Sequence, residues 1–435
     1  MNPRDIKIQF CKYKITKFEI IIPGETDPFV IDDAHMGNWS IEKDYENYVF
    51  PYMEFRCIVP DAIYRKIMQT SEDVLVDLKI EYAYFDDMYE MDPTDAVYMY
   101  NTLLEARFYA FIANKSPKMT DGMYGEAIKD VNNEAGTYTQ YSYDNNKALV
   151  MGLYRVEHIF RTNCTTNAIL GNATAADAVT YMFQKISVDN VLMSPSDNPK
   201  VYDQLVIPPL HTPQGMLRVI NTYALHSAGT ILFFDYDKVY VIDKRLGTTA
   251  WTNNEVTSVY LTSFPSTSDQ SIMKSGFFEN RIEKYWVINI VGNSISIEND
   301  AMYADQLVGG NILAIDSNTG EITQLRSDIT VSKNSPGSSG TVNRVVIQDI
   351  GSSNTLQSAK TEIEQSQNTL NVVVENINIK ALAPNKDFIF TTDNTKYQTY
   401  AGHYRIRNMS AIFTKESELY SCMCTATFVG GKSSL

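Results

Sequence analysis

The chain has 435 residues, of which 44% are hydrophobic and 11% aromatic, and its formal net charge is −15. This length predicts roughly two to four domains, and the apolar content argues against disorder over most of the chain. The acidic balance, without clustered Lys and Arg, argues against a surface that binds duplex DNA.

Residues 1–115 favour a β-rich domain. The segment 74–85 alternates apolar and charged residues, which is the pattern of a half-buried strand. Its apolar face would carry Val76, Leu78, Ile80, Tyr82 and Tyr84. Between two such strands we expect Asp61 to cap a short helix that turns Ile63, Ile67 and Met68 inward. We predict one tube-like β-barrel domain here.

Residues 116–149 are polar and rich in turn formers, which predicts an exposed connection or insert. Residues 150–265 have a different pattern, typical of an α+β domain with two helices and a hairpin. The first helix would begin at Thr174 or Asp177 and bury one apolar stripe. The second would follow Pro213, and a hairpin would follow it with a tight turn near Asp237 and Lys238.

Residues 266–435 return to strand-like segments, interrupted by a Ser/Gly-rich loop at 333–359 around one short strand. We expect a second tube-like β-barrel domain there. The predicted fold class is therefore mainly β with an α+β middle: two tube-like β-barrel domains that frame a small mixed domain.

The chain shows neither a membrane anchor nor a disulfide framework. No apolar run approaches the roughly 20 residues needed to span a bilayer, and no basic segment followed by an apolar run opens the sequence. Five scattered cysteines are an odd number, which favours free thiols. We expect a protein made in the cytoplasm that carries no membrane segment.

Catalytic signatures are missing from the sequence. It contains no phosphate-binding loop, no nucleophile elbow and no H-E-x-x-H motif. The five histidines are dispersed, at His35, His158, His211, His226 and His403. We therefore predict that the protein is not an enzyme, and we assign no catalytic, cofactor-binding or metal-binding residue and no cofactor.

Two short patterns raise the question of an ion site. Alternation along a strand would place Cys422 and Cys424 on one face, but two thiolates do not complete a tetrahedral site, so buried thiols are favoured. Asp235 and Asp237 occupy alternate positions and could share a cation. Their place at a strand end favours a turn, where Asp accepts backbone hydrogen bonds.

A third pattern is basic. His403, Arg405 and Arg407 would lie on one strand face, with Tyr404 and Ile406 turned inward. We interpret this face as solvated or as facing another subunit, rather than as a nucleic-acid site.

Four segments, in this order, resemble the central hub proteins of contractile phage tails and the hub part of type VI secretion spikes. They are the opening strands (7–25, 55–67 and 74–83), the helix around Ala178–Phe183, the proline-marked helix and hairpin at 206–243, and the closing strands at 401–428. The resemblance covers most of the chain. The insert at 85–147 and the loop at 333–359 depart from the compact pattern of that family.

The resemblance implies a structural virion protein, a baseplate hub that forms a homotrimer. Each chain would supply two barrels, and the six barrels would adapt a sixfold tail tube to a threefold central spike. Implied partners are the tail tube or its initiator, the spike and other baseplate proteins, with DNA involved only by passage through the lumen. Such a protein would be assembled in the host cytoplasm.

Two other functions stay open at this stage. A tail-associated cell-wall hydrolase would need a recognisable catalytic set, which we do not find in the sequence. A β-rich adhesin or carbohydrate-binding protein could stack sugars on exposed aromatic residues such as Trp39 or Trp251.

Overall fold

The protein is described here from a computed structural model. The described residues are 10–85, 99–112, 146–211, 213–226, 229–244, 258–263, 276–280, 285–290, 295–298, 312–316, 322–325, 344–348, 368–392, 395 and 397–431. Among them, no helix is both long and apolar enough to cross a bilayer.

Eight strands close into a β-barrel, which confirms that the chain is mainly β. Neighbouring strands pair in the order β22-β3-β4-β7-β6-β5-β1-β23, and β23 pairs with β22 to complete the ring. The strands are β1 (Phe10–Ile21), β3 (Met36–Asp44), β4 (Tyr52–Pro60), β5 (Leu75–Phe85), β6 (Asn101–Ile112), β7 (Asn146–Arg155), β22 (Gly402–Glu416) and β23 (Leu419–Gly431). Closure leaves this barrel without a free strand edge.

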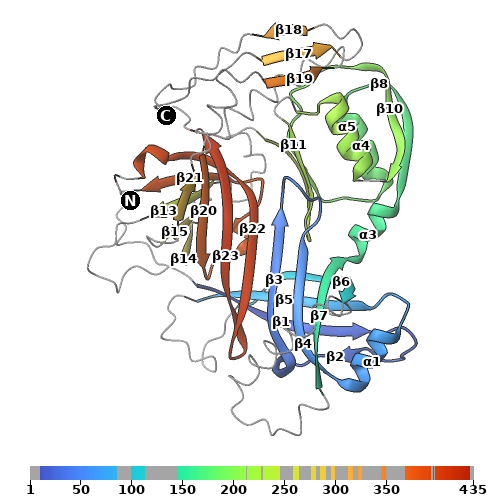
Figure 1. Cartoon of the computed structure of the whole chain (residues 1–435), viewed down its shortest axis with the longest axis vertical. Coiled ribbons are helices and arrows are strands. Elements are labelled where there is room, and N and C mark those ends of the chain that lie inside the picture. Colours follow the sequence, from blue (N-terminus) through green and yellow to red (C-terminus); the bar gives the residue numbers. More distant parts are fainter. Residues whose placement is uncertain are drawn as a thin grey trace.

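The long hairpin β22–β23 belongs to two groups of strands at once. Its lower part pairs with β3 and β1 of the barrel, and its upper part pairs with β21 (Asp387–Thr392) and β20 (Asn368–Glu375). A register shift lies between Ile406 and Asn408, where the partner of β22 changes from β21 to β3. In Figure 1 this hairpin, in red, runs from the upper sheet down beside the blue barrel strands.

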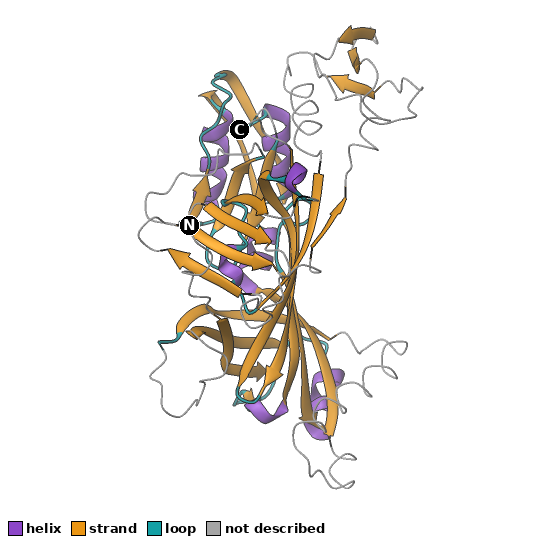
Figure 2. Cartoon of the chain, turned by 90° about the vertical axis from the view of Figure 1, so that its left-hand side faces the viewer, coloured by secondary structure: helices purple, strands orange, loops and turns teal. Residues whose placement is uncertain are grey.

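Further strands extend the sheet away from the barrel. Beyond β21 the order continues through β13 (Ser258–Ser263), β15 (Tyr285–Ile290) and β14 (Gly276–Asn280). On the other side, β16 (Ile295–Glu298) pairs with β20, and β2 (Phe29–Val30) pairs with β1. A separate three-stranded sheet contains β17 (Ile312–Asp316), β18 (Ile322–Leu325) and β19 (Arg344–Gln348). Figure 2 shows the long strands running from the lower barrel into the upper sheet.

Residue Asn376 separates two strands where the barrel meets the upper sheet. Its N–H donates to the carbonyl of Cys422 on β23, and its carbonyl accepts from the N–H of Cys11 on β1, both at 2.7 Å. Its φ of 54° is left-handed, a conformation that Asn tolerates better than most residues. The turn after β20 therefore replaces direct pairing between β1 and β23 at this point.

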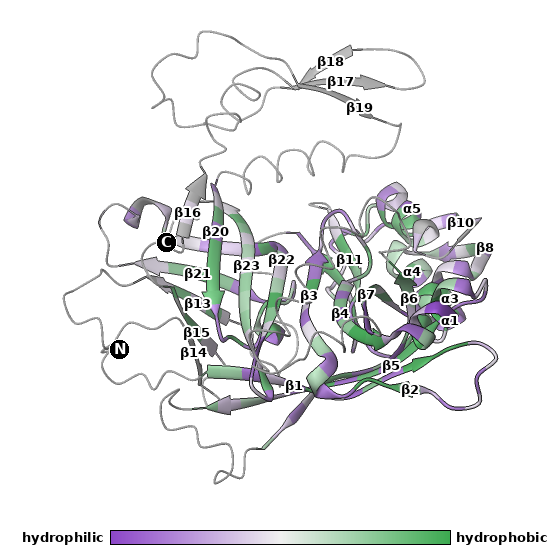
Figure 3. Ribbon diagram, turned by 60° about the horizontal axis from the view of Figure 1, so that its bottom comes forward, coloured by the Kyte–Doolittle hydropathy of each residue, from purple (hydrophilic) through white to green (hydrophobic). Residues whose placement is uncertain are grey.

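Side chains fill the barrel interior. Trp39 is 2% exposed and stacks between Phe55 and Phe413, with ring centroids 5.2 and 3.6 Å away. Tyr13 contacts Phe413 edge-on at 4.8 Å. An eight-stranded barrel is just wide enough for such packing, so the barrel is a solid core and not a channel. In Figure 3, hydrophobic residues recur along β4, β5 and β23, and the buried ones among them supply this core.

The middle of the chain is mixed, but it contains three helices where two were predicted, because α3 follows β7 in a segment where no helix was expected. It contains α3 (Val156–Asn163), β8 (Thr165–Ala173), α4 (Ala175–Lys185), β9 (Val191–Met193), β10 (Tyr202–His211), α5 (Gln214–Tyr223), β11 (Thr230–Phe234) and β12 (Val239–Asp243). Thr174 caps α4 in a capping box with Asp177, which confirms the predicted start at Thr174. The helices α4 and α5 pack with the hairpin β11–β12 around a second hydrophobic core.

Two local predictions need correction or extension. Pro60, not Asp61, is the N-cap of α1 (Asp61–Gln69); Asp61 lies in the first turn and pairs with Arg65 at 2.6 Å instead. Ile67 is buried as predicted. In β5 the predicted apolar face packs on the barrel core, but Ala83 and Phe85 on the opposite face are buried too, against Phe10.

The domain boundaries remain a prediction. Strand pairing joins segments that lie in different predicted domains. The barrel takes six strands from residues 10–155 and two from 402–431. β7 continues from the predicted insert 116–149 into the barrel, and β13, predicted within 150–265, pairs with β21. Most of the insert, and the Ser/Gly-rich loop except for β19, lie outside the described residues.

Candidate functional site

The turn of the hairpin β11–β12 meets the barrel at a buried ion pair. Nζ of Lys43, on β3, donates to both carboxylate oxygens of Asp235 at 2.8 and 2.7 Å. Lys43 is 7% exposed and Asp235 6%. Two charges removed from water in this way require each other, because either one alone would pay the full desolvation penalty. The pair therefore fixes the hairpin against the barrel.

Several further bonds hold the same turn. Nε2 of His158, on α3, donates to the carbonyl of Asp235 at 3.1 Å, and Arg155 donates to the carbonyl of Tyr236. The side-chain amide of Asn190 donates to the carbonyl of Asp237 at 2.6 Å. Three side chains from two segments of the chain thus satisfy the backbone carbonyls of one turn, which holds the turn in place.

His158 is held neutral at this joint. It is 1% exposed and stacks on Phe50 with ring centroids 5.1 Å apart. Burial, helped by the positive charges of Arg155 and Arg161, lowers the pKa of His158 to about 3. Protonation of His158 would therefore place a positive charge in a buried site next to two arginines, which is unfavourable.

We expect acid to lower the folding stability of the protein because of His158. Below the ordinary pKa of about 6.5 the unfolded chain binds a proton that the folded chain excludes, so stability falls as pH drops toward 3. At pH 5 this loss amounts to about 2 kcal/mol. His158→Gln keeps a donor for the Asp235 carbonyl but does not titrate.

Urea unfolding at pH 7 and pH 5 measures this difference. The His158→Gln variant should lose less stability between the two pH values than the wild type does. The exposed Gln69 at the end of α1 offers a control without an ionisable group, and Gln69→Ala should leave the pH dependence unchanged. Equal pH slopes in the wild type and His158→Gln would contradict the assignment.

A second, partly buried connection joins the loop after β3 to the hairpin β22–β23. Glu46 pairs with Arg405 and, at 3.0 Å, with Arg407. Burial by itself would raise the pKa of Glu46, but the charge of Arg405 and its hydrogen bond outweigh burial, and the pKa is lowered. Nearby, the hydroxyl of Tyr45 donates to the carbonyl of Leu382 at 2.7 Å.

These contacts correct the interpretation of the basic strand face. Tyr404 and Ile406 are buried as predicted, but Arg405 is only 8% exposed and is bound by Glu46. His403 pairs with Asp387 at 2.9 Å. The face is therefore largely occupied by carboxylates of the same chain rather than being solvated.

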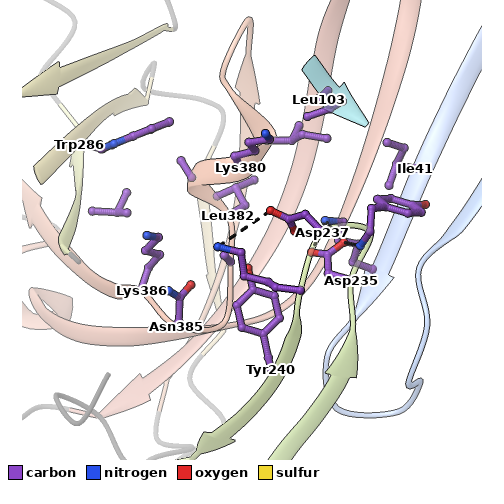
Figure 4. A pocket seen from close by; sticks show the side chains of 17 residues that line it. Ile41, Leu103, Asp235, Asp237, Tyr240, Trp286, Lys380, Leu382, Asn385 and Lys386 are labelled. Atoms are coloured by element: carbon purple, nitrogen blue, oxygen red, sulfur yellow. Dashed lines mark hydrogen bonds and ion pairs between the residues drawn. The ribbon is translucent and has the colours of Figure 1, made fainter. Parts of the chain in front are cut away.

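A cavity of about 350 Å³ lies beside the ion pair, where the barrel, the hairpin β11–β12 and the upper sheet meet. Its walls combine charged and apolar side chains. Figure 4 shows Lys386 and Asn385 on one side of the cavity and Asp235 and Asp237 on the other, with Trp286 and Lys380 nearby.

The thiol pair behaves as the sequence indicated. Cys422 and Cys424 are buried while Met423 between them is 44% exposed, as strand alternation requires. Burial raises the pKa of Cys424 to about 12, so this thiol stays protonated at neutral pH. Within the described part of the chain, no three His, Cys, Asp or Glu side chains are placed to hold a metal ion.

Asp235 and Asp237 take different roles. Both flank the turn that the sequence predicted, and Asp235 accepts from the N–H of Tyr236 at 2.8 Å. Its main partner, however, is Lys43, which sequence reasoning missed because the two residues are 192 positions apart. Asp237 has a half-exposed side chain 4.0 Å from Lys238. The structure therefore does not bring the two carboxylates together around one cation.

The remaining histidines serve separate local contacts. His226 is buried and interacts with Ser194 at 2.9 Å and Thr230 at 2.8 Å, while His35 pairs with Asp32 on the surface. His211 ends β10, and nothing is described of its side chain. The five histidines thus stay dispersed in space as they are in the sequence.

Comparison with solved structures finds weak overall likenesses. A tail protein from Neisseria meningitidis MC58 is 10% identical at a TM-score of 0.48, covering 95% of this chain and 96% of that one. The 43 kDa tail protein of prophage MuSo2 from Shewanella oneidensis is 7% identical at 0.48, covering 94% and 97%. The E. coli c3393 protein, described as a component of the type VI secretion system, is 8% identical at 0.41, covering 94% and 76%. At such values a shared function does not follow.

Comparison by sequence is more decisive. The chain matches none of the curated proteins. A family model described as the bacteriophage PBS1 gene 109 protein matches residues 12–428, from the first barrel strand into the last. Because this match spans nearly the whole sequence, the chain belongs to the bacteriophage PBS1 gene 109 protein family.

Proposed function

We propose that the chain is a structural, non-catalytic virion protein that lies in the phage tail, at the central hub of the baseplate. The observation that carries the proposal is the closed barrel, which is built from both ends of the chain and shares its hairpin β22–β23 with the upper sheet. Because one hairpin is hydrogen-bonded to both groups of strands, the two groups are held together, as a subunit of a ring-shaped assembly requires. Membership of a bacteriophage protein family supports the same conclusion.

In this proposal the upper strands form a second tube-like unit. They are β13, β14, β15, β20 and β21, together with the upper parts of β22 and β23. The mixed elements between α3 and β12 make up the small middle domain. The ion pairs Lys43–Asp235 and Glu46–Arg405 would then fix how barrel, middle domain and hairpin sit in each subunit.

Three such chains would form a ring with six barrel-like units. A duplicated unit lets a threefold assembly present six similar surfaces, which would adapt the sixfold tail tube, or its initiator, to a threefold spike and to other baseplate proteins. Because the barrel interior is filled by residues such as Trp39 and Phe413, DNA would pass through the centre of the ring rather than through a barrel.

The β8–β10 ribbon offers a surface for contact between subunits. Among the strands that the structure describes, these two pair only with each other, and an isolated two-stranded ribbon is marginally stable. Its inner face packs on α4 and α5, while Ile169 and Val206, opposite each other on the outer face, are 70% and 47% exposed. We propose that a neighbouring chain covers this apolar pair.

Light scattering across a concentration series tests the assembly. We expect a trimer, alone or with its spike partner, and a shift toward monomer for Ile169→Asp, because a carboxylate would be buried at the contact. Gln69→Asp places the same charge on the exposed end of α1 and should leave the mass unchanged.

The possible masses separate the hypotheses. A protein that stays monomeric with its tail partners would overturn the hub proposal. If the Ile169→Asp variant has the mass of a trimer, the subunits form a trimer but the contact between them lies elsewhere.

The adhesin alternative receives no support from Trp39. This residue is 2% exposed inside the barrel, so its ring does not reach a sugar. Trp251, the other aromatic residue considered for sugar stacking, lies outside the described residues.

A further inference from the structure

A groove of about 620 Å³ runs along the outer side of the barrel, between the loop after β3 and the strands β3, β4, β7 and β22. Glu42, Tyr52 and Tyr154 line it from three of these strands. Each of them is next in sequence to a buried core residue, so its own side chain faces away from the barrel interior. The groove is therefore open to a partner from outside.

Tyrosine rings form much of the wall of this groove. Tyr52 and Tyr154 lie on the neighbouring strands β4 and β7, with ring centroids 5.4 Å apart and planes tilted by 47°. Phe111 on β6 extends the row and meets Tyr154 edge-on at 5.5 Å. Tyr48, in the loop after β3, also lines the groove and is 67% exposed. The rings thus present aromatic faces and hydroxyl groups to solvent.

A glycine lets one of these rings lie against the sheet. A Cβ atom at Gly152 would be 2.7 Å from the hydroxyl oxygen and 2.8 Å from Cε2 of Tyr52. These distances are too short for a real contact, so any larger residue on β7 would displace the ring. The position of Tyr52 is therefore built into the backbone of the barrel.

A carboxylate without a counter-charge lies beside the rings. Glu42 is directly opposite Tyr52 in the pairing of β3 with β4, and it is exposed. Within the described part of the chain, no lysine or arginine pairs with Glu42. Asp44, by contrast, accepts hydrogen bonds from the N–H groups of Glu46 and Asn47, and Lys43 is bound by Asp235.

The electrostatics of the groove favours a cation. Burial raises the pKa of Tyr52 to about 12, and the charges of Glu54, Tyr154 and Glu42 contribute to the rise. Burial also raises the pKa of Tyr154, and Tyr48 and Glu42 raise it further. The carboxylate of Glu42 thus acts on both rings, and the faces of aromatic rings attract positive charge as well.

We infer that this groove binds an arginine side chain presented by a protein partner, with the guanidinium against the rings of Tyr52, Tyr154 and Tyr48 and its N–H groups donating to Glu42. A guanidinium is planar, stacks on aromatic faces and donates two parallel hydrogen bonds to a carboxylate, whereas the ammonium of lysine is a compact point charge. Arginine and tyrosine are both enriched in protein interfaces. The inference concerns one face of one chain and does not depend on the proposed trimer.

The probe is the peptide acetyl-Gly-Arg-Gly-amide, and its binding to the full chain is followed by saturation-transfer NMR at low salt. We expect saturable binding, with the strongest transfer to the arginine side chain. The same peptide with citrulline, the neutral analogue of arginine, should not bind, and the lysine peptide should bind more weakly. Added NaCl should weaken binding, because the carboxylate is exposed to solvent.

Two surface variants test the assigned residues. Glu42→Gln should weaken binding of the arginine peptide about threefold, the effect of removing an exposed ion pair. Tyr48→Leu should weaken it by about the same factor, the effect of removing an exposed cation–π contact. The matched controls are Glu72→Gln and Tyr100→Leu, which change an exposed glutamate and an exposed tyrosine outside the groove and should leave binding unchanged.

The other outcomes overturn the inference. It fails if the arginine peptide does not bind, if the citrulline or lysine peptide binds as tightly, or if Glu42→Gln and Tyr48→Leu both bind as the wild type does. N-acetylglucosamine is tested alongside, because tyrosine rings beside a carboxylate also suit a sugar. Binding of this sugar without binding of the arginine peptide would replace the protein partner by a carbohydrate.

Discussion

Replacing Lys43 by Met is expected to destabilise the protein by about 3–5 kcal/mol, because Asp235 would keep a buried charge without its partner. Both side chains are almost fully buried, and Lys43 donates to both carboxylate oxygens. Asp235→Asn alone leaves the opposite charge stranded. The double variant Lys43→Met/Asp235→Asn removes both charges, so it should be more stable than the sum of the single effects predicts.

Urea unfolding followed by circular dichroism measures these differences. The exposed pair Lys66–Glu25, at 2.7 Å, provides the control, since Lys66→Met removes an ion pair that solvent screens and should cost less than about 1 kcal/mol. If Lys43→Met cost no more than Lys66→Met, the ion pair would not hold the hairpin against the barrel.

Replacing Trp39 by Ala is expected to cost about 3–5 kcal/mol, because it leaves a large void in the barrel core. The indole ring fills the space between Phe55 and Phe413 and contacts Tyr420 edge-on at 6.0 Å. The loss of stability should affect the whole barrel, because its strands come from both ends of the chain and share this core. Trp39→Phe keeps an aromatic ring in the stack and should cost clearly less.

Near-UV circular dichroism and thermal unfolding report this change. Tyr48, which is 67% exposed, supplies the control, and Tyr48→Ala should alter stability by no more than about 0.5 kcal/mol. The adhesin hypothesis predicts a different outcome, in which Trp39→Ala folds normally but no longer binds cells. A fully stable Trp39→Ala variant would contradict the packed-barrel description.

Local patterns in the sequence predicted many of the secondary-structure features, although they missed α3. Alternation placed the apolar face of β5 and the buried pair Cys422 and Cys424, because successive strand residues point to opposite faces. The capping residue Thr174 marked the start of α4, and a turn was correctly expected between β11 and β12. Each of these features depends on residues that are close in sequence, so periodicity and capping chemistry suffice to predict them.

The cap of α1 shows where such local reasoning fails. Asp61 is a favoured capping residue, yet Pro60 takes the N-cap position because β4 continues to Pro60 and the helix follows at once. The strand pairing of β4 with β7 extends to Pro60 and therefore sets the boundary. A tertiary contact here overrides a local preference.

Tertiary structure alone decided how the barrel closes and what lies at its joint. Periodicity tells which face of a strand is buried, but not which strand it pairs with, so the pairing of β22 with β3 could not be predicted. The same holds for Lys43 and Asp235, and for Tyr13, whose hydroxyl donates to the carbonyl of Ile377 at 2.7 Å. The sequence by itself determined the faces and the local turns of this protein. Which strands and side chains pair across hundreds of residues was decided only by the tertiary structure. Burying a charge or a strand edge requires a complementary group, and the local sequence does not specify that group.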